Sequence, residues 1–152
     1  METQNIFVRR ATVADLELVV PLFDAYRQFY GQTRDLDLAR AFLRERLERE
    51  QAVIFLALDA QRSAVGFTQL FPSFSSAAAR RIFILNDLFV DPAARRCGVG
   101  QRLLSAAADL ARGQGAVRLT LSTALTNTPA QSLYEAAGWR RDEVFCGYNL
   151  AL

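Results

Sequence analysis

Residues 95–100, Arg-Arg-Cys-Gly-Val-Gly, have the composition and spacing of a turn that binds an anion. They follow an apolar segment and an Asp-Pro pair, and they precede the pattern of an amphipathic helix. Gly98 and Gly100 carry no Cβ, so a bulky anion can come close to the backbone. The first N–H groups of a helix have no partner inside it, and the helix dipole favours negative charge there. Positive charge around the turn comes from three arginines, Arg95, Arg96 and Arg102. The pattern predicts a pyrophosphate site formed largely by main-chain N–H groups.

Two common phosphate-binding motifs do not fit this turn. A P-loop requires a lysine, and all 18 basic residues of the chain are arginine. A dinucleotide-binding turn requires a third glycine, and Leu103 stands at that position. The ligand is therefore expected to belong to another class of pyrophosphate compound.

A longer pattern that includes this turn matches a known signature. Residues 90–104 read Val-x-Pro-x-x-Arg-x-x-Gly-x-Gly-x-x-Leu-Leu, which resembles the acetyl-CoA-binding signature of the GNAT superfamily of N-acetyltransferases. Residues 127–139, Asn-x-x-Ala-x-x-Leu-Tyr-Glu-x-x-Gly-Trp, resemble the later signature of the same family. With a compatible N-terminal half, the resemblance covers essentially the whole chain.

The resemblance implies acetyl-CoA as the acetyl donor. No metal is expected, because a chain with two cysteines and no histidine has almost no ligands for a zinc or iron site. In the family, pantetheine inserts between two splayed strands, here residues 81–90 and 117–122, and main-chain N–H groups near residues 88–90 stabilise the oxyanion. Asn127 would hydrogen-bond near the pantetheine arm or serve as a turn or cap residue. The expected acetyl-CoA-binding residues are Leu88, Phe89, Val90, Arg95, Arg96, Cys97, Gly98, Val99, Gly100, Gln101, Asn127 and Tyr134.

Acetyl transfer to an amine also needs groups that move protons. The amine must be neutral when it attacks, and the departing thiolate should be protonated. The chain has no histidine, so the usual proton carrier is absent. The resemblance places Tyr134 near the sulfur as the general acid, and a phenol with a pKa of about 10 matches a thiolate of comparable basicity. The alternative for Tyr134 is a buried aromatic on an amphipathic helix.

The base is expected at Asn86-Asp87, on the strand that enters the site. Polyamine acetyltransferases of this superfamily carry a Leu-Glu-Asp-like segment here, and the glutamate is linked to amine deprotonation through water. Because Asn86 stands at the glutamate's position, that role does not transfer to it, and Asp87 would orient water or bind a cationic amine instead. A buried unpaired acid costs several kcal/mol, so the alternative is a structural pair with a nearby arginine. The amine could also bind neutral, with solvent as base.

The acceptor pocket is expected between the first two helices and the loop that joins them. Three aromatic residues lie just before this loop, namely Tyr26, Phe29 and Tyr30. An aromatic wall with Asp35 or Asp37 at its edge would suit an alkylammonium group, although helical spacing also suits core positions for two of the rings. Residues 71–76, in a predicted loop, form a second candidate rim. The expected acceptor-binding residues are Tyr26, Tyr30, Asn86 and Asp87.

The elements that must position these residues follow from hydrophobic spacing. Seven strands are expected, over residues 5–10, 52–59, 64–71, 81–90, 117–122, 140–146 and 147–151. Helices are expected over residues 12–30, 35–50 and 98–112, and a short fourth helix is capped by Thr128 with Pro129 at its first position. Pro21 is expected to kink or interrupt the first helix. This order is that of a GNAT, an α/β (α+β) fold in which helices flank a mixed, mostly antiparallel sheet.

Composition limits the class of protein. The chain has 152 residues, of which 51% are hydrophobic and 22% charged, and we expect one domain over residues 1–152. A net charge of +2 without long runs of like charge argues against nucleic acid as a partner. Cys97 and Cys146 have no disulfide or metal-ligand spacing. The polar N-terminus and the lack of an apolar stretch of about 20 residues argue against a signal peptide and a membrane span. A cytoplasmic location is expected.

The sequence therefore predicts an acetyl-CoA-dependent N-acetyltransferase that acts on a primary amine, with a small amine or polyamine favoured. The segment around Asp87 places it nearest the diamine and polyamine acetyltransferase-like branch. The alternatives are a protein or peptide N-acetyltransferase, acting on an N-terminus or a lysine, and a CoA-binding module without catalysis. Family members are often dimers, so a homodimer is one expected state.

Overall fold

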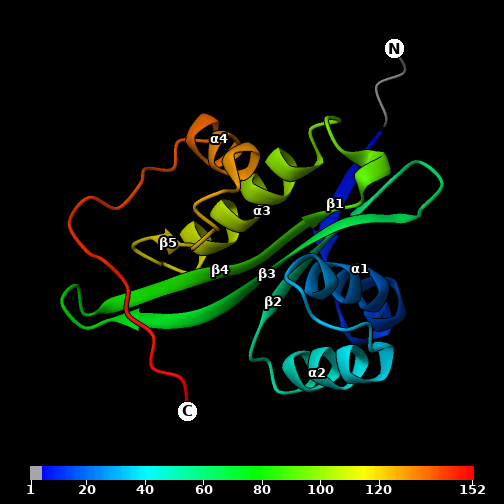
Figure 1. Ribbon diagram of the computed structural model, residues 1–152, viewed down its shortest axis with the longest axis horizontal. Coiled ribbons are helices and arrows are strands. Elements are labelled where there is room, and N and C mark those ends of the chain that lie inside the picture. The colour runs from blue at the N-terminus through cyan, green and yellow to red at the C-terminus, as the bar shows by residue number, and fades with distance from the viewer. Residues whose placement is uncertain (1–4) are drawn as a thin grey trace. The chain divides into compact units, whose positions relative to one another are not determined.

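The computed structural model describes residues 5–152, which divide into two compact units. The first unit ends at Ser122 and contains the sheet and three helices (Figure 1). The second unit, Thr123–Leu152, contains one helix, α4 (Thr128–Ala136).

The sheet of the first unit has five strands in the order β1-β2-β3-β4-β5. Their bounds are β1 (Phe7–Arg10), β2 (Val53–Leu58), β3 (Ala64–Ser75), β4 (Arg80–Val90) and β5 (Leu119–Thr120). The first four strands pair antiparallel with their neighbours, and β5 pairs parallel with β4. The expected mixed, mostly antiparallel sheet is confirmed.

Helices cover both faces of this sheet. A 3-10 turn at Val13–Asp15 leads into α1 (Leu16–Phe29), and α1 lies with α2 (Leu36–Glu48) on one face (Figure 1). The other face is covered by α3 (Val99–Gly113), which follows a 3-10 turn at Pro92–Ala94. Pro21 lies inside α1 without interrupting it, because the helix is assigned continuously on both sides of this residue.

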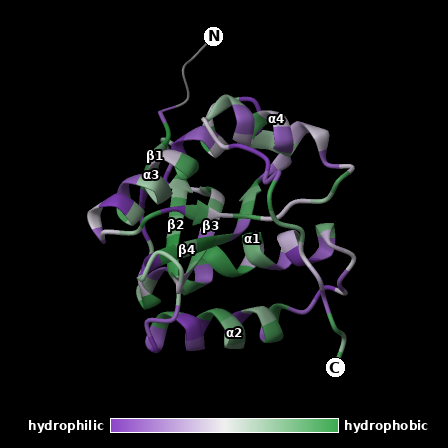
Figure 2. Cartoon of the chain, turned by 90° about the vertical axis from the view of Figure 1, so that its left-hand side faces the viewer, coloured by the Kyte–Doolittle hydropathy of each residue, from purple (hydrophilic) through white to green (hydrophobic). Residues whose placement is uncertain are grey.

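Two apolar clusters hold these layers together. On the α1 face, Val19, Phe23, Leu43 and Phe67 are all at most 7% exposed. On the α3 face, the cluster consists of Ile6, Ala57, Val99 and Leu103. Burying one such large side chain contributes about 1.5–3 kcal/mol to the free energy of unfolding. In Figure 2 the strands are coloured largely hydrophobic, and α2 alternates between hydrophobic and hydrophilic residues.

The third strand is longer than the sequence predicts. β3 continues to Ser75, so residues 72–75 are strand rather than loop, and Pro72 pairs with Phe83. The pairing of β3 with β2 stops at Leu70, which leaves the later part of β3 as an edge. Proline lacks an N–H and is tolerated at such an edge, so the Pro-Ser-Phe-Ser segment forms a strand although the prediction for it is a loop.

The two strands expected at residues 140–146 and 147–151 do not form, so the sheet has five strands and not about seven. Residues 140–152 are exposed throughout, and Val144 and Tyr148 are 81% and 91% exposed. Alternating apolar residues fit a strand, but a strand also needs a partner for its backbone groups. Here the main-chain N–H groups of Val144 and Phe145 donate to the carboxylate of Asp142 instead.

Candidate active site

The end of β4 has an open edge. Its pairing with β5 is limited to Phe83 with Leu119 and Ile84 with Thr120, and no strand of residues 5–152 pairs with the later part of β4 on that side. The N–H of Asp91 points the other way, toward β3, and donates to the Val65 carbonyl at 2.8 Å. Because the direction of N–H groups alternates along a strand, those of Leu88 and Val90 face the open side.

A β-bulge lies just before this open segment. Gln69 of β3 is opposite Asp87, whereas the next residue, Leu70, is opposite Leu85, so Asn86 is the extra residue. A bulge bends its strand and redirects the neighbouring side chains. As a result, Asn86 is exposed, while Asp87 is buried beneath α1 with 2% exposure.

Asp87 is surrounded by uncharged hydrogen-bond donors. Gln69 Nε2 donates to its Oδ2, and Asn86 Nδ2 donates to its Oδ1 at 2.8 Å. Burial raises the pKa of Asp87, and hydrogen bonds from Asn86, Gln69 and Tyr26 act in the opposite direction. Within residues 5–152 no arginine forms an ion pair with Asp87, so the expected structural pair with an arginine is not present. The result is a buried carboxyl without a neutralising cation.

Two of the expected acceptor-binding residues meet at this bulge, and a third adjoins them. The Tyr26 hydroxyl of α1 donates to the Asn86 carbonyl at 3.0 Å. The Tyr30 ring lies edge-on to the Tyr26 ring, with 5.0 Å between centroids, and Tyr30 is 47% exposed. Tyr26 also packs against the core, as its helical spacing predicted. The structure therefore brings Tyr26, Tyr30, Asn86 and Asp87 into one cluster.

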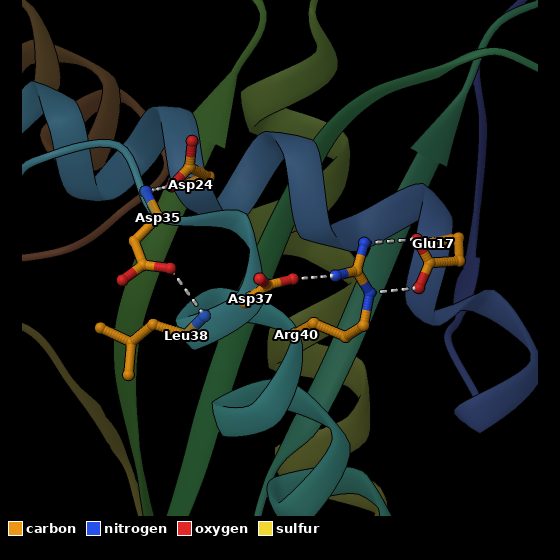
Figure 3. A network of polar contacts seen from close by, with 6 residues as sticks. All are labelled: Glu17, Asp24, Asp35, Asp37, Leu38 and Arg40. Atoms are coloured by element: carbon orange, nitrogen blue, oxygen red, sulfur yellow. Dashed lines mark hydrogen bonds and ion pairs between the residues drawn. The ribbon is translucent and has the colours of Figure 1, made fainter.

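The connection between α1 and α2 is fixed by its own polar contacts (Figure 3). Buried Asp24 accepts a hydrogen bond from the main-chain N–H of Asp35 at 2.9 Å, and the Asp35 carboxylate caps α2 by accepting from the Leu38 N–H at 3.0 Å. Arg40 binds both Glu17 and Asp37. The carboxylates of Asp35 and Asp37 thus each make one hydrogen bond or ion pair within the chain.

The turn before α3 has the backbone that an anion site requires. Gly98 is the N-cap of α3 with a φ of 78°, and Arg96 has a φ of 63°. The first hydrogen bond of the helix runs from Arg102 N–H to the Gly98 carbonyl at 3.2 Å. The N–H groups of Val99, Gly100 and Gln101 precede this bond and are available to a ligand. Arg95, Cys97 and Gly98 are exposed at the same turn.

The three arginines near this turn have different partners. Arg95 Nε donates to the Val90 carbonyl at 3.0 Å, which ties the turn to the end of β4. Arg96 is exposed. Arg102 Nη1 donates to the Ile6 carbonyl at 2.8 Å and links α3 to the segment before β1.

Two positions with a role in this geometry were not identified from the sequence. Gly66 of β3 lies beneath the first turn of α3, where a Cβ would be 3.1 Å from Val99 Cγ1. Gln69 is 1% exposed and contacts Asp87, although the two residues are 18 positions apart. The only signal for Gln69 was an amide inside an otherwise apolar strand.

The second unit contains the remaining expected residues. Asn127 is the N-cap of α4, and its Oδ1 accepts from the Ala130 N–H at 3.3 Å, so the capping role expected of Thr128 belongs to Asn127. Tyr134 is half-buried, and its ring lies 6.1 Å from that of Trp139. Both residues keep their expected ligand roles as predictions.

In residues 5–152, no three His, Cys, Asp or Glu side chains are grouped so that they could hold a metal ion. None of the helices in the same range is long and apolar enough to cross a membrane.

Comparison with known proteins gives a consistent result. The model of the acetyltransferase (GNAT) family matches residues 19–139. The chain is 50% identical over 143 residues to the uncharacterized N-acetyltransferase YhfO of Bacillus subtilis, which covers 94% of this chain and 95% of that protein. It is 35% identical over 100 residues to aminoglycoside N(6')-acetyltransferase type 1 of Klebsiella aerogenes, covering 64% of this chain and 65% of the relative.

Solved structures show the same fold. The crystal structure of a probable acetyltransferase matches with a TM-score of 0.91 and 44% identity, over 96% of this chain and 97% of the other. An aminoglycoside N-acetyltransferase, AAC(6')-Iy in complex with CoA, matches with a TM-score of 0.81 and 21% identity, over 98% and 97% of the two chains.

Proposed function

The chain belongs to the acetyltransferase (GNAT) family, and from this premise we propose that it transfers the acetyl group of acetyl-CoA to a primary amine of a small molecule. One observation carries the proposal. The open edge of β4 runs directly into a turn whose first N–H groups precede the first helical hydrogen bond, so a thioester arm and its pyrophosphate have adjacent places to bind.

The cofactor is held mainly by backbone in this proposal. The pyrophosphate binds the N–H groups at the start of α3, with Arg95 and Arg96 beside it. The pantetheine arm lies along β4 as an additional strand and pairs with main-chain groups of Leu88 and Val90. One of these N–H groups donates to the thioester carbonyl, whose oxygen becomes negative when the amine attacks.

The reaction moves two protons from the amine. The acceptor reaches the site as an ammonium ion and loses one proton to become nucleophilic, and its nitrogen then attacks the carbonyl carbon. When the carbon–sulfur bond breaks, the nitrogen loses its second proton and the thiolate gains one. We assign the acid to Tyr134, on the strength of its position in the Leu-Tyr-Glu motif. We assign the base to Asp87, because a carboxyl whose pKa is raised by burial accepts a proton better at neutral pH.

The acceptor is proposed to be a small molecule that carries several amines, such as an aminoglycoside or a polyamine. The sequence similarity to an aminoglycoside acetyltransferase supports the first class, and the Asn-Asp-Leu-Phe-Val segment supports the second. The aromatic edge formed by Tyr26 and Tyr30 suits an alkylammonium group of either class.

The test is acetyl-CoA-dependent release of free CoA across a panel of amines. The panel contains aminoglycosides, diamines, polyamines, amino acids, and peptides with free N-termini or lysines. We expect turnover with one of the first three groups. Turnover with peptides alone would replace the small-molecule proposal by protein acetylation, and acetyl-CoA binding without any turnover would favour a non-catalytic CoA-binding module.

A further inference from the structure

Gln69 is a buried polar residue in the middle of a central strand. It lies on β3, paired with both β2 and β4, and is 1% exposed. It stands opposite Asp87 at the bulge, and both side chains face the α1 side of the sheet, as Phe67 does two residues earlier.

The nitrogen and the oxygen of the Gln69 side-chain amide differ in their hydrogen bonding. Gln69 Nε2 donates to Asp87 Oδ2, but Gln69 Oε1 is buried and has no hydrogen-bond partner in residues 5–152. Leaving a buried acceptor unpaired is unfavourable, and an apolar side chain of similar size would avoid the cost. A buried amide at this position therefore calls for a reason, and its side-chain hydrogen bond is with Asp87.

The groups that face Asp87 come from three elements. They are Gln69 from β3, Asn86 from β4 itself and Tyr26 from α1, and only Tyr26 among them is titratable. Gln69 and Asn86 donate to the carboxyl without carrying a positive charge, so these donors oppose the effect of burial. Asn86 is exposed and can exchange its contact for water, whereas Gln69 is fully enclosed. Gln69 is thus the most firmly held of the three.

We propose that Gln69 is a positioning residue for acetyl transfer, which fixes the Asp87 carboxyl through its Nε2 and keeps it ionised so that it can accept the proton of the acceptor amine. This inference rests on the role proposed above for Asp87. It adds that the protonation of Asp87 is set by a residue of the neighbouring strand, which does not touch the substrate.

Two variants separate this role from a merely structural one. Gln69→Met removes the donor and the unpaired acceptor but keeps a side chain of similar length. Thr68→Val is the matched control, because Thr68 is equally buried and its Oγ1 donates to the main-chain carbonyl of Asp87 at 2.8 Å, not to the carboxyl. Both variants alter β3 beside the same residue.

The measurement is the titration of the Asp87 carboxyl by carbon NMR, with Asp87→Asn to assign its signal. We expect Gln69→Met to raise the pKa of Asp87 by about one unit, the effect of losing one hydrogen bond to a charged group. The acidic limb of kcat/KM, measured with the fastest acceptor of the amine panel, should move to higher pH by the same amount. Thr68→Val should change neither.

The outcomes distinguish the two proposals. An unchanged Asp87 titration in Gln69→Met overturns the role of Gln69, even if Asp87→Asn is inactive. Wild-type kcat/KM in Asp87→Asn shows instead that Asp87 is not the base, which refutes the proposed chemistry independently of the titration. Equal shifts in Gln69→Met and Thr68→Val would assign the effect to general disturbance of β3 and overturn the inference.

Discussion

Gly66→Ala should disturb the turn before α3, because the added methyl group points at the first turn of this helix. A Cβ at this position would lie 3.0 Å from the Phe89 carbonyl oxygen, 3.1 Å from Val99 Cγ1 and 3.4 Å from Leu103 Cδ1. The oxygen belongs to a paired strand, and the two side chains are buried with 2% and 0% exposure. None of these atoms can move away freely, so α3 must shift at its first turn.

The loss of stability expected for Gly66→Ala follows from this crowding. Adding a methyl group to a filled core typically costs about 1–3 kcal/mol, which for a chain of this size lowers Tm by on the order of 5 °C. Because Val99 contributes one of the N–H groups that precede the first helical hydrogen bond, the same shift should weaken acetyl-CoA binding. Thermal unfolding and isothermal titration calorimetry measure the two effects.

Gly113→Ala is the matched control. Gly113 is the last residue of α3, and a Cβ there would have no neighbour within 4 Å. Alanine in a helix is favoured over glycine by roughly 0.5–1 kcal/mol, so this variant should be as stable as wild type or slightly more stable, with unchanged affinity. If Gly66→Ala also kept wild-type Tm and acetyl-CoA affinity, the argument that α3 needs a glycine beneath it would be refuted.

Three further predictions concern the turn, the acid and the pH dependence of stability. Gly100→Asp should abolish acetyl-CoA binding in calorimetry, since it adds a negative charge beside the pyrophosphate, and retained affinity would exclude the turn as the site. Tyr134→Phe should lower kcat with little change in cofactor affinity, and an unchanged kcat would remove the acid assignment. Arg9 donates to the Asp15 carboxylate at 2.8 and 2.7 Å and holds its pKa below the ordinary value. The stability this pair contributes is present above the ordinary aspartate pKa of about 3.9 and is lost as the pH falls through the lower value of the folded state. Chemical unfolding from pH 7 to pH 2 should therefore show a shallower acid loss for Asp15→Asn, and an identical slope would contradict the assignment.

The backbone geometry of the turn before α3 could be predicted from sequence because its determinants are local. A glycine at positive φ, a helix that starts beside it and a preceding strand all lie within residues 84–104. The same holds for α1, where the capping pattern at Thr12 is present and the Thr12 N–H donates to Asp15 Oδ2 at 2.8 Å. Pro21 does not interrupt α1. The apolar face of this helix is buried against β3, and this tertiary packing outweighs the local tendency of proline to break a helix.

The prediction of two strands at the end of the chain was wrong for the opposite reason, because strand pairing is not determined locally. Val144, Cys146, Tyr148 and Leu150 alternate as a half-buried strand would, and yet residues 140–152 have no ladder partner. Periodicity describes which face a strand would bury and does not supply the neighbour that pairs with it. Strand pairing depends on residues far away in sequence, and this is where prediction from pattern is weakest.

The surroundings of Asp87 show why register matters for chemistry as well as for fold. The sequence suggested an arginine as the structural partner of this acid, which is reasonable in a chain with 18 basic residues that are all arginine. A guanidinium would hold the pKa of Asp87 low and make the carboxylate a poor base at neutral pH. The register of β3 and β4, with its bulge at Asn86, instead places the Gln69 amide opposite the carboxyl. Uncharged donors only partly offset burial, so the pKa of Asp87 remains raised. This property suits proton acceptance, and it depends on a strand alignment that no motif around Asp87 encodes.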